Sequence, residues 1–150
     1  MEKRSAFLVV NGPNLNLLGE REPSVYGNKT LQDLEKECLD WASQRKVQVD
    51  FFQSNSEGVL IDFMQKHRKS ARGIVLNAGA YTHYSYAIRD CIASIDVPIV
   101  EVHLSNPEAR EQFRHISLLS PVVAGKIAGF GFYGYIMALD ALMYMTVSSC

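Results

Sequence analysis

Short apolar segments alternate with segments of helical periodicity along the whole chain, and this alternation restricts the fold more than any other feature. The first segment, Ala6 to Val10, is uniformly apolar, as a strand buried on both faces of a sheet should be. Leu31, Leu34 and Cys38 then recur at three- and four-residue steps, which is typical of an amphipathic helix. Repeated strand and helix units of this kind predict βαβ crossovers and a parallel sheet.

The remainder of the chain continues this pattern without a linker, an internal repeat or a low-complexity tract. With right-handed crossovers, five strands give a three-layer, doubly wound parallel α/β sheet, and we expect a flavodoxin-like strand order. A chain of 150 residues suits one catalytic domain, residues 1–150. The further strands are expected at 47–53, 73–76, 97–100 and 122–123 with 127–130, and the helices at 30–42, 56–67, 87–95, 107–114 and 133–146.

Charge and cysteine content exclude several classes of protein. Fifteen basic and sixteen acidic residues give a net charge of −1, which does not favour nucleic acid or anionic lipid as a partner. Cys38, Cys91 and Cys150 are far apart and lack metal-type spacing, so neither a disulfide framework nor a metal site is expected. The apolar stretch 130–147 is interrupted by Asp140 and by glycines, unlike a membrane span. We therefore expect a cytoplasmic protein with small-molecule or protein partners.

Polar segments follow four of the predicted strands. Ligands of open parallel sheets bind beyond the carboxyl ends of the strands, so these segments are expected to share one rim. Turns and helix caps would explain any one of them, but four together favour a binding site. The segments are Asn11-Gly12-Pro13-Asn14, Ser54-Asn55-Ser56, Asn77-Ala78-Gly79 and His103-Leu104-Ser105-Asn106.

Glu101 and His103 are two residues apart on a strand and therefore lie on the same face. A carboxylate beside an imidazole fixes the tautomer of the ring and favours its protonated form. This arrangement suits a general acid, and a purely structural pair at the end of the sheet is the alternative.

Residues 19–27 are bounded by Gly19 and Gly27 and follow the first strand, so we expect a mobile lid loop over the rim. Tyr26 in this loop could act as a base only if a cation such as Arg21 stabilises its phenolate form, and a packing role stays open. His83, expected at the start of the third helix, could hold a polar ligand or cap the helix. Arg114 is either an anion or hydroxyl contact or a solvated surface charge.

Five ordered motifs in this sequence closely resemble those of the type II 3-dehydroquinate dehydratases, over essentially the whole chain. The resemblance implies a flavodoxin-like fold and the dehydration of 3-dehydroquinate to 3-dehydroshikimate, a lyase reaction. It implies an anti elimination through an enolate, with no metal and no cofactor. The motifs are Asn11 to Gly19, Arg21-Glu22-Pro23 followed by Tyr26-Gly27, Gln53 to Gly58, Asn77 to His83 and Glu101 to Asn106.

Site roles follow from the resemblance position by position. Tyr26 corresponds to the base that takes the C2 proton, and Arg21 to the lid residue that favours its ionised form. Asn14 corresponds to the residue that holds a water against the enolate oxygen, and His103, oriented by Glu101, to the acid that protonates the departing C1 hydroxyl. Leu104 and Ser105 correspond to the positions that bind the substrate carboxylate, and Asn77, His83 and Arg114 to those that bind its hydroxyl groups. Asp90 corresponds to a position that reaches a neighbouring subunit's site, and the family forms homododecamers built from trimers.

Two positions depart from the family pattern, and three other functions compete with this one. Glu108 stands where relatives often carry histidine or an aromatic residue, and Ile116 stands where they often carry a second histidine. These differences are expected to affect substrate affinity and subunit contacts but not the reaction. A flavin-binding module and a receiver domain are disfavoured, because the first loop lacks both a hydroxyl-rich phosphate cradle and an acidic cluster. A Schiff-base dehydratase would use Lys126. The reaction itself serves both the shikimate pathway, which supplies aromatic amino acid biosynthesis, and quinate breakdown.

Overall fold

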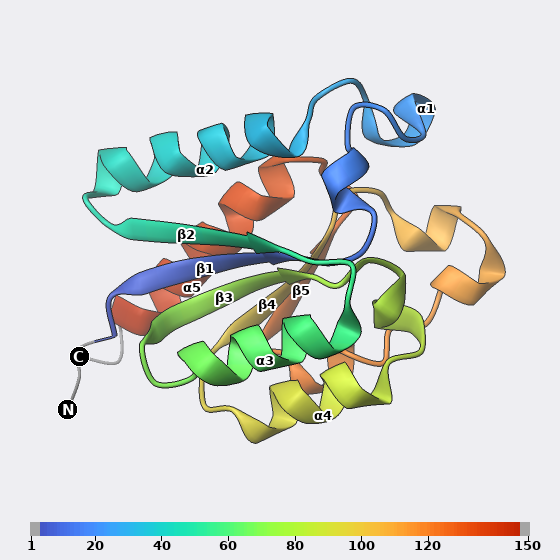
Figure 1. The fold of residues 1–150 in the computed structure, drawn as a ribbon. Coiled ribbons are helices and arrows are strands. Elements are labelled where there is room, and N and C mark those ends of the chain that lie inside the picture. The colour runs from blue at the N-terminus through green and yellow to red at the C-terminus, as the bar shows by residue number, and fades with distance from the viewer. Residues whose placement is uncertain (1–3, 148–150) are drawn as a thin grey trace.

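A computed structural model describes residues 4–147 and contains a five-stranded, wholly parallel sheet (Figure 1). The strand order is β2-β1-β3-β4-β5, which is the doubly wound order of flavodoxin-like proteins. The predicted fold class is confirmed. The strands are β1 (Ala6–Asn11), β2 (Gln48–Gln53), β3 (Ala71–Asn77), β4 (Ile99–His103) and β5 (Gly125–Ala128).

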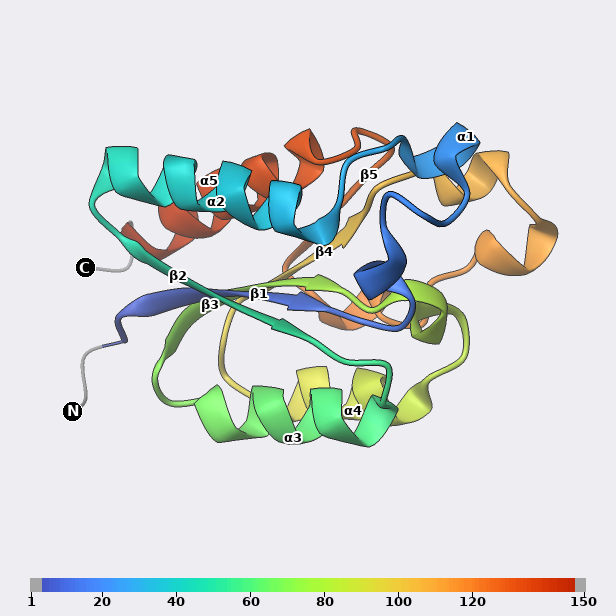
Figure 2. The same ribbon diagram turned by 45° about the horizontal axis from the view of Figure 1, so that its top comes forward.

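Helices cover both faces of the sheet. Figure 2 shows α2 and α5 on one face and α3 and α4 on the other. A capping box in which Thr30 and Asp33 satisfy each other's backbone donors begins α2, and the Ser56 side chain caps α3. The α-helices are α1 (Pro23–Tyr26), α2 (Leu31–Arg45), α3 (Glu57–His67), α4 (Tyr86–Ser94) and α5 (Tyr133–Val147), and the 3-10 turns are η1 (Leu15–Leu17), η2 (Gly79–His83), η3 (Pro107–Ala109), η4 (Gln112–Arg114) and η5 (Ser120–Val122).

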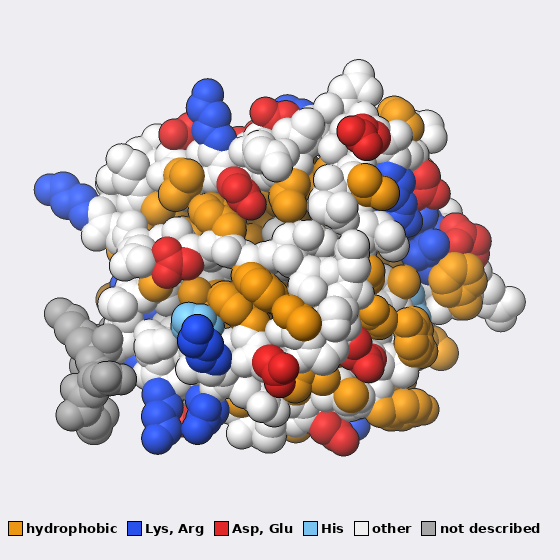
Figure 3. Space-filling model, viewed as in Figure 1, with side chains coloured by type: hydrophobic (Ala, Val, Ile, Leu, Met, Phe, Trp, Pro, Cys, Tyr) orange, Lys and Arg blue, Asp and Glu red, His pale blue; other side chains and the backbone are white. Residues whose placement is uncertain are grey.

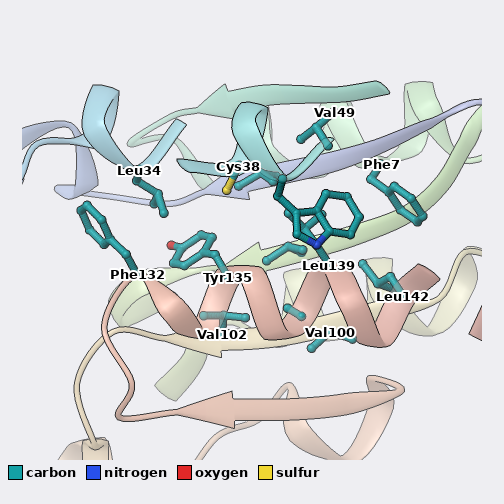
Figure 4. Close-up of a cluster of buried hydrophobic side chains, with 14 of the residues drawn as sticks. Phe7, Leu34, Cys38, Val49, Val100, Val102, Phe132, Tyr135, Leu139 and Leu142 are labelled. Atoms are coloured by element: carbon teal, nitrogen blue, oxygen red, sulfur yellow. The ribbon is translucent and has the colours of Figure 1, made fainter. Parts of the chain in front are cut away.

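The sheet is buried on both faces, so the core has two halves. Every residue of β1 is buried, which agrees with its apolar run from Ala6 to Val10, and its last residue, Asn11, is a buried polar group. Figure 4 shows Tyr135 and Leu139 of α5 packed between β4 and Leu34 and Cys38 of α2. The other half of the core lies under α3 and α4. This rigid frame holds the carboxyl ends of the strands at one end of the molecule.

Four predicted elements differ in the structure. The lid over 19–27, expected to be a loop, contains the one-turn helix α1. The short helix expected over 107–114 is divided into η3 and η4, because Arg110 between them has extended backbone (φ −111°, ψ −162°). Residues 122–123 are not a strand, since Pro121 cannot donate a ladder hydrogen bond and instead lies in η5. His83 ends η2 rather than beginning α4, which is capped by the side chain of Ser85.

Tyr135 joins the core to the end of the sheet where the polar segments lie. Its hydroxyl donates to Oδ1 of Asn11 at 2.6 Å and accepts from Nδ2 of Asn77 at 2.9 Å. Burial raises the pKa of Tyr135, and the hydrogen bond from Asn77 only partly opposes this, so the phenol stays neutral. The side chains that end β1 and β3 are therefore held by one buried hydroxyl.

Removing this hydroxyl is expected to destabilise the fold. Tyr135→Phe leaves an amide oxygen and an amide N–H buried without their partner, which costs about 1–3 kcal/mol of unfolding free energy. Urea denaturation measures the change, and Tyr133→Phe on the same helix, 61% exposed, is the control. The control is expected to change by less than about 0.5 kcal/mol. Equal unfolding free energies for both variants would contradict this role of Tyr135.

Candidate active site

The carboxyl ends of β1, β3 and β4 surround a cavity of about 280 Å³. The predicted rim is therefore present, and the segment that follows β2 contacts it through Asn55. Asn55 accepts the backbone N–H of Asn14 through Oδ1 at 2.9 Å, and its carbonyl accepts the hydroxyl of Tyr81 at 2.7 Å. The lining residues include Asn14, Arg21, Tyr26, Asn77, His83, His103, Leu104, Ser105, Arg110 and Arg114.

The turn after β1 depends on a glycine. A Cβ at Gly12 would lie 2.7 Å from the backbone of Ala78, so only glycine permits this approach. The Gly12 N–H donates to the carbonyl of Asn77 at 2.7 Å, which holds the ends of β1 and β3 together. Asn14 follows in a left-handed conformation, φ 68°, which asparagine tolerates better than most residues. The turn thereby brings Asn14 to the cavity wall.

Glu101 and His103 form a close buried pair at the end of β4. Nε2 of His103 lies 2.5 Å from Oε2 of Glu101, whose side chain is fully buried. Nε2 is bound to the carboxylate, so Nδ1 is the ring nitrogen that can exchange a proton with a ligand in the cavity that His103 lines. The pairing predicted from the two-residue spacing is present.

The pKa of Glu101 lies below its ordinary value. Burial acts to raise it, but the hydrogen bond and positive charge of His103, together with two serine hydroxyls, outweigh burial. A lowered carboxyl pKa stabilises the fold at pH values above the unfolded pKa, and this contribution is lost as the pH falls through the folded pKa. We expect the unfolding free energy of the wild type to fall more steeply than that of Glu101→Gln between about pH 5 and pH 3. Parallel urea-denaturation curves at these pH values would contradict this.

His83 is held in one tautomer. Its Nδ1 lies 2.8 Å from the carbonyl oxygen of Ile116, and a carbonyl only accepts, so Nδ1 carries the hydrogen. Burial lowers the pKa of His83, and the nearby His103 and Arg114 lower it further, against the hydrogen bond to Ile116. The ring is therefore neutral at pH 7, and Nε2 can accept a hydrogen bond from a hydroxyl group.

Tyr26 is bound by an arginine that the sequence analysis did not single out. Nη1 of Arg110 donates to the Tyr26 hydroxyl oxygen at 2.6 Å, and the Arg110 side chain is only 13% exposed. Arg21 lies over the Tyr26 ring, with its guanidinium carbon 5.7 Å from the ring centroid. Glu22 lies between the two guanidinium groups, 3.5 Å from Arg21 and 3.4 Å from Arg110. The closest cation to the phenol oxygen is thus Arg110.

The other predicted substrate-binding residues are partly engaged within the chain. Nε of Arg114 donates to Glu111 at 2.9 Å, while Arg114 still lines the cavity. Oδ1 of Asn77 accepts the N–H of Gly79 at 3.1 Å. Asp90 is exposed on α4 and does not line the cavity of its own chain.

The cavity wall is cationic. Three arginines and two histidines line it, and no Asp or Glu is among its described lining residues. Figure 3 shows acidic and basic side chains mixed over the visible face, with several basic ones at the end where α1 and the turns of residues 107–114 lie. Such a cavity suits a small anion, most simply a carboxylate. A larger hollow of about 890 Å³ at the amino ends of the strands is lined mainly by apolar residues and lacks histidine and tyrosine.

Two other kinds of site are absent from the described part of the chain. Within residues 4–147, no group of three or more His, Cys, Asp or Glu side chains is placed to hold a metal ion. Over the same range, no helix has the length and apolar character needed to cross a membrane.

Comparison with known proteins now gives the family. Residues 5–143 match the family described as Dehydroquinase class II. The chain belongs to this family. A protein of Agrobacterium fabrum named 3-dehydroquinate dehydratase 1 is 52% identical over 93% of this chain and 97% of its own length. A 3-dehydroquinate dehydratase of Bacillus cereus strain B4264 is 56% identical over 91% and 94%. The type II dehydroquinase of Butyrivibrio crossotus has a TM-score of 0.90 at 48% identity, covering 93% of this chain and 97% of its own.

Membership of the class II dehydroquinases confirms the resemblance inferred from the motifs, and with it the assignment to the dehydratase class of enzymes. Arg110 is the dehydroquinase residue that sequence reasoning missed. It is 84 positions from Tyr26, and nothing in its local sequence marks it apart from other surface arginines. The only available signal was its place between two short helical turns near the fourth polar segment.

Proposed function

We propose that the cavity binds 3-dehydroquinate and that the chain dehydrates it to 3-dehydroshikimate by anti elimination through an enolate. Family membership supports the substrate and the reaction. The observation that carries the mechanism is the 2.6 Å contact between Arg110 and the Tyr26 oxygen in the same cavity as His103.

Tyr26 is the proposed base. Removing a proton α to a ketone requires a stronger base than an ordinary carboxylate, and a phenolate meets this need if a cation stabilises it. Arg110 donates directly to the oxygen, while Arg21 adds positive charge over the ring. Both arginines thus place positive charge beside the phenol group, and residues 19–27, which carry Arg21 and Tyr26, close over the substrate as a lid.

The enolate and the leaving group need two further residues. Asn14 at the cavity wall holds a water that donates to the developing enolate oxygen. His103, with Nε2 on Glu101, protonates the departing C1 hydroxyl so that it leaves as water. Water and the conjugated enone are the only products, and every proton is accounted for by Tyr26 and His103, without a metal or cofactor.

Substrate binding uses the remaining lining residues. The carboxylate binds at Leu104 and Ser105 through a backbone N–H and a hydroxyl, in a cavity whose charges are positive. Neutral His83 accepts from a substrate hydroxyl through Nε2, and Asn77 and Arg114 bind the other hydroxyl groups. Glu108 is exposed, so its added negative charge lies outside the cavity lining.

We also propose that Asp90 completes a neighbouring subunit's site, in trimers that assemble into a dodecamer. Asp90 is exposed and does not line the cavity of its own chain. Exposed apolar side chains, which a subunit contact would bury, lie near Asp90 in sequence and in the segment 113–116 that follows the cavity residue Arg110. Sedimentation velocity tests the assembly, and a monomer at catalytic concentrations would contradict it. The exposed apolar residues are Tyr84, Tyr86, Phe113 and Ile116.

A reducing compartment, the cytoplasm, fits the two described thiols. Cys38 and Cys91 are free and buried, and Cys150 lies outside the described residues. Burial, with the nearby negative charges of Glu37 and Glu35, raises the pKa of Cys38 to about 12, so this thiol is unreactive.

The test of the proposed function is a direct assay of the product. The purified protein is mixed with 3-dehydroquinate, and the ultraviolet absorbance of the conjugated enone is followed. We expect steady formation of this chromophore, unaffected by a metal chelator. No absorbance change with folded protein at millimolar substrate would reject the proposal and favour a binding role.

Borohydride treatment is expected to leave the enzyme active, because the proposed mechanism forms no imine. Lys126, the lysine that a Schiff-base mechanism would use, is exposed on β5 and does not line the cavity. The enzyme is treated with borohydride in the presence of substrate, and intact mass and residual activity are measured. A reduced substrate adduct on a lysine, accompanied by inactivation, would replace the enolate mechanism by imine chemistry.

A further inference from the structure

Two serine hydroxyls bind the carboxylate of Glu101 in addition to His103. Oγ of Ser117 donates to Oε2 at 2.8 Å, and Oγ of Ser120 donates to Oε1 at 2.8 Å. With Nε2 of His103 at 2.5 Å, the fully buried carboxylate has three hydrogen-bonding partners. Neither serine lines the cavity, so neither touches the substrate.

The direction of the Ser117 hydrogen bond is fixed by the backbone. Its Oγ accepts the N–H of Leu119 at 3.1 Å and the N–H of Ser120 at 3.0 Å. A hydroxyl oxygen has two lone pairs and one hydrogen. Because both lone pairs are occupied, the hydrogen of Ser117 can only be donated, and its acceptor is Glu101. The turn around Ser117 therefore presents a permanent donor to the carboxylate.

We infer that Ser117 and Ser120 are positioning residues that keep the proton shared by Glu101 and His103 on the imidazole ring. The inference deepens the proposed function and rests on it, since it concerns the acid role of His103. When Nδ1 also carries a hydrogen, the proton between Nε2 and the carboxylate lies either on the ring, which gives an imidazolium with a carboxylate, or on the oxygen, which gives a neutral imidazole with a carboxylic acid. Hydroxyls bind a carboxylate more strongly than a neutral acid, so each serine favours the ion pair, by about five- to tenfold.

The surroundings of the pair agree with this role. Burial acts to raise the pKa of Glu101, yet the hydrogen bonds and charge around it give a net lowering. Among the described residues, the charged or titratable groups around the pair include His83, whose ring centroid is 6.5 Å from that of His103, and Arg114, which lines the same cavity as both histidines. Lys126 on β5 is paired in register with Glu101. From α4, Arg89 donates to the carbonyl of Leu118 at 3.1 Å and so fixes the segment between the serines.

Ring protonation can be measured without catalysis. We would label histidine with ¹⁵N, identify the His103 signals by their loss in His103→Asn, and record ligand-free spectra at pH 7. The wild type is expected to show a hydrogen on Nε2 of His103. Ser120→Ala, which removes a hydroxyl that donates to Glu101, is expected to lower the fraction of rings with a hydrogen on Nε2, and a Ser117→Ala/Ser120→Ala double variant to lower it further.

Kinetics provide the second measurement. For Ser120→Ala, kcat is expected to fall up to about tenfold with little change in KM, because the acid and not the binding site is affected. Modest acidification does not restore kcat, since the proton has moved to Glu101 rather than to solvent. Ser120→Thr keeps a hydroxyl and is expected to restore both the spectrum and kcat. Ser94→Ala, which removes a hydroxyl bound to the Cys91 carbonyl away from the site, is the matched control.

Three results would overturn the inference: a wild-type His103 ring without a hydrogen on Nε2, an unchanged His103 spectrum in the double variant, or a loss of kcat with an unchanged spectrum, which indicates a structural role only. Failure of the proposed function is distinguishable from these. A wild type that does not dehydrate 3-dehydroquinate rejects the proposed function, while the ¹⁵N spectra still report whether the serines hold the proton on His103.

Discussion

Tyr26→Phe is expected to abolish dehydration, lowering kcat by about 10³-fold or more, because only the ionisable oxygen that takes the substrate proton is lost. The Tyr26 side chain is half-buried at the end of α1 and packs against the core through its ring, which phenylalanine keeps, so the fold should not change. Initial rates of enone formation at saturating substrate measure the effect. Circular dichroism and sedimentation should match the wild type.

The control for this variant is Tyr133→Phe, which removes an exposed phenol oxygen far along the chain from the lid. Its kcat should equal that of the wild type. If Tyr26→Phe retains a tenth or more of the wild-type kcat, Tyr26 is not the base, and another group must be sought.

Arg110→Ala is expected to lower kcat/KM by about 10²- to 10³-fold, because removing one hydrogen-bond donor from a negatively charged oxygen in an active site usually has an effect of this size. The loss should fall mainly on kcat, because Arg110 donates to the oxygen of the proposed base at 2.6 Å. Initial rates of enone formation over a range of substrate concentrations measure both constants.

Two other arginine variants make the test specific. Arg21→Ala should lower kcat less, because Arg21 lies over the ring with its guanidinium carbon 5.7 Å from the ring centroid, whereas Arg110 donates to the oxygen. Arg68→Ala, at an exposed arginine at the end of α3, should leave kcat and KM unchanged. A larger loss of kcat for Arg21→Ala than for Arg110→Ala would assign the electrostatic role to Arg21, as the motif resemblance implied.

The fold was largely predictable because its signals are local. The apolar run of β1 and the Thr30 and Asp33 box before α2 each identify an element from a few adjacent residues. The errors arose where the chain is irregular. Extended backbone at Arg110 and the missing donor of Pro121 replace a helix and a strand by short turns, and neither has a periodic signal.

The site was predictable only where its residues share one element or one motif. Glu101 and His103 are adjacent on a face of β4, so their spacing alone indicated the pair. The contact between Tyr26 and Arg110 joins positions 84 residues apart, and Ser117 reaches Glu101 from an irregular segment. Such contacts depend on how loops pack over the strand ends, which neither periodicity nor residue type records.

A crystal structure of the enzyme with a non-reacting analogue of 3-dehydroquinate tests the central claim most directly. We expect the Tyr26 oxygen, still bound by Arg110, to lie within about 3.5 Å of the carbon that corresponds to C2, on the side from which the proton leaves. A structure in which that oxygen points elsewhere, with a different side chain facing this carbon, would contradict the account.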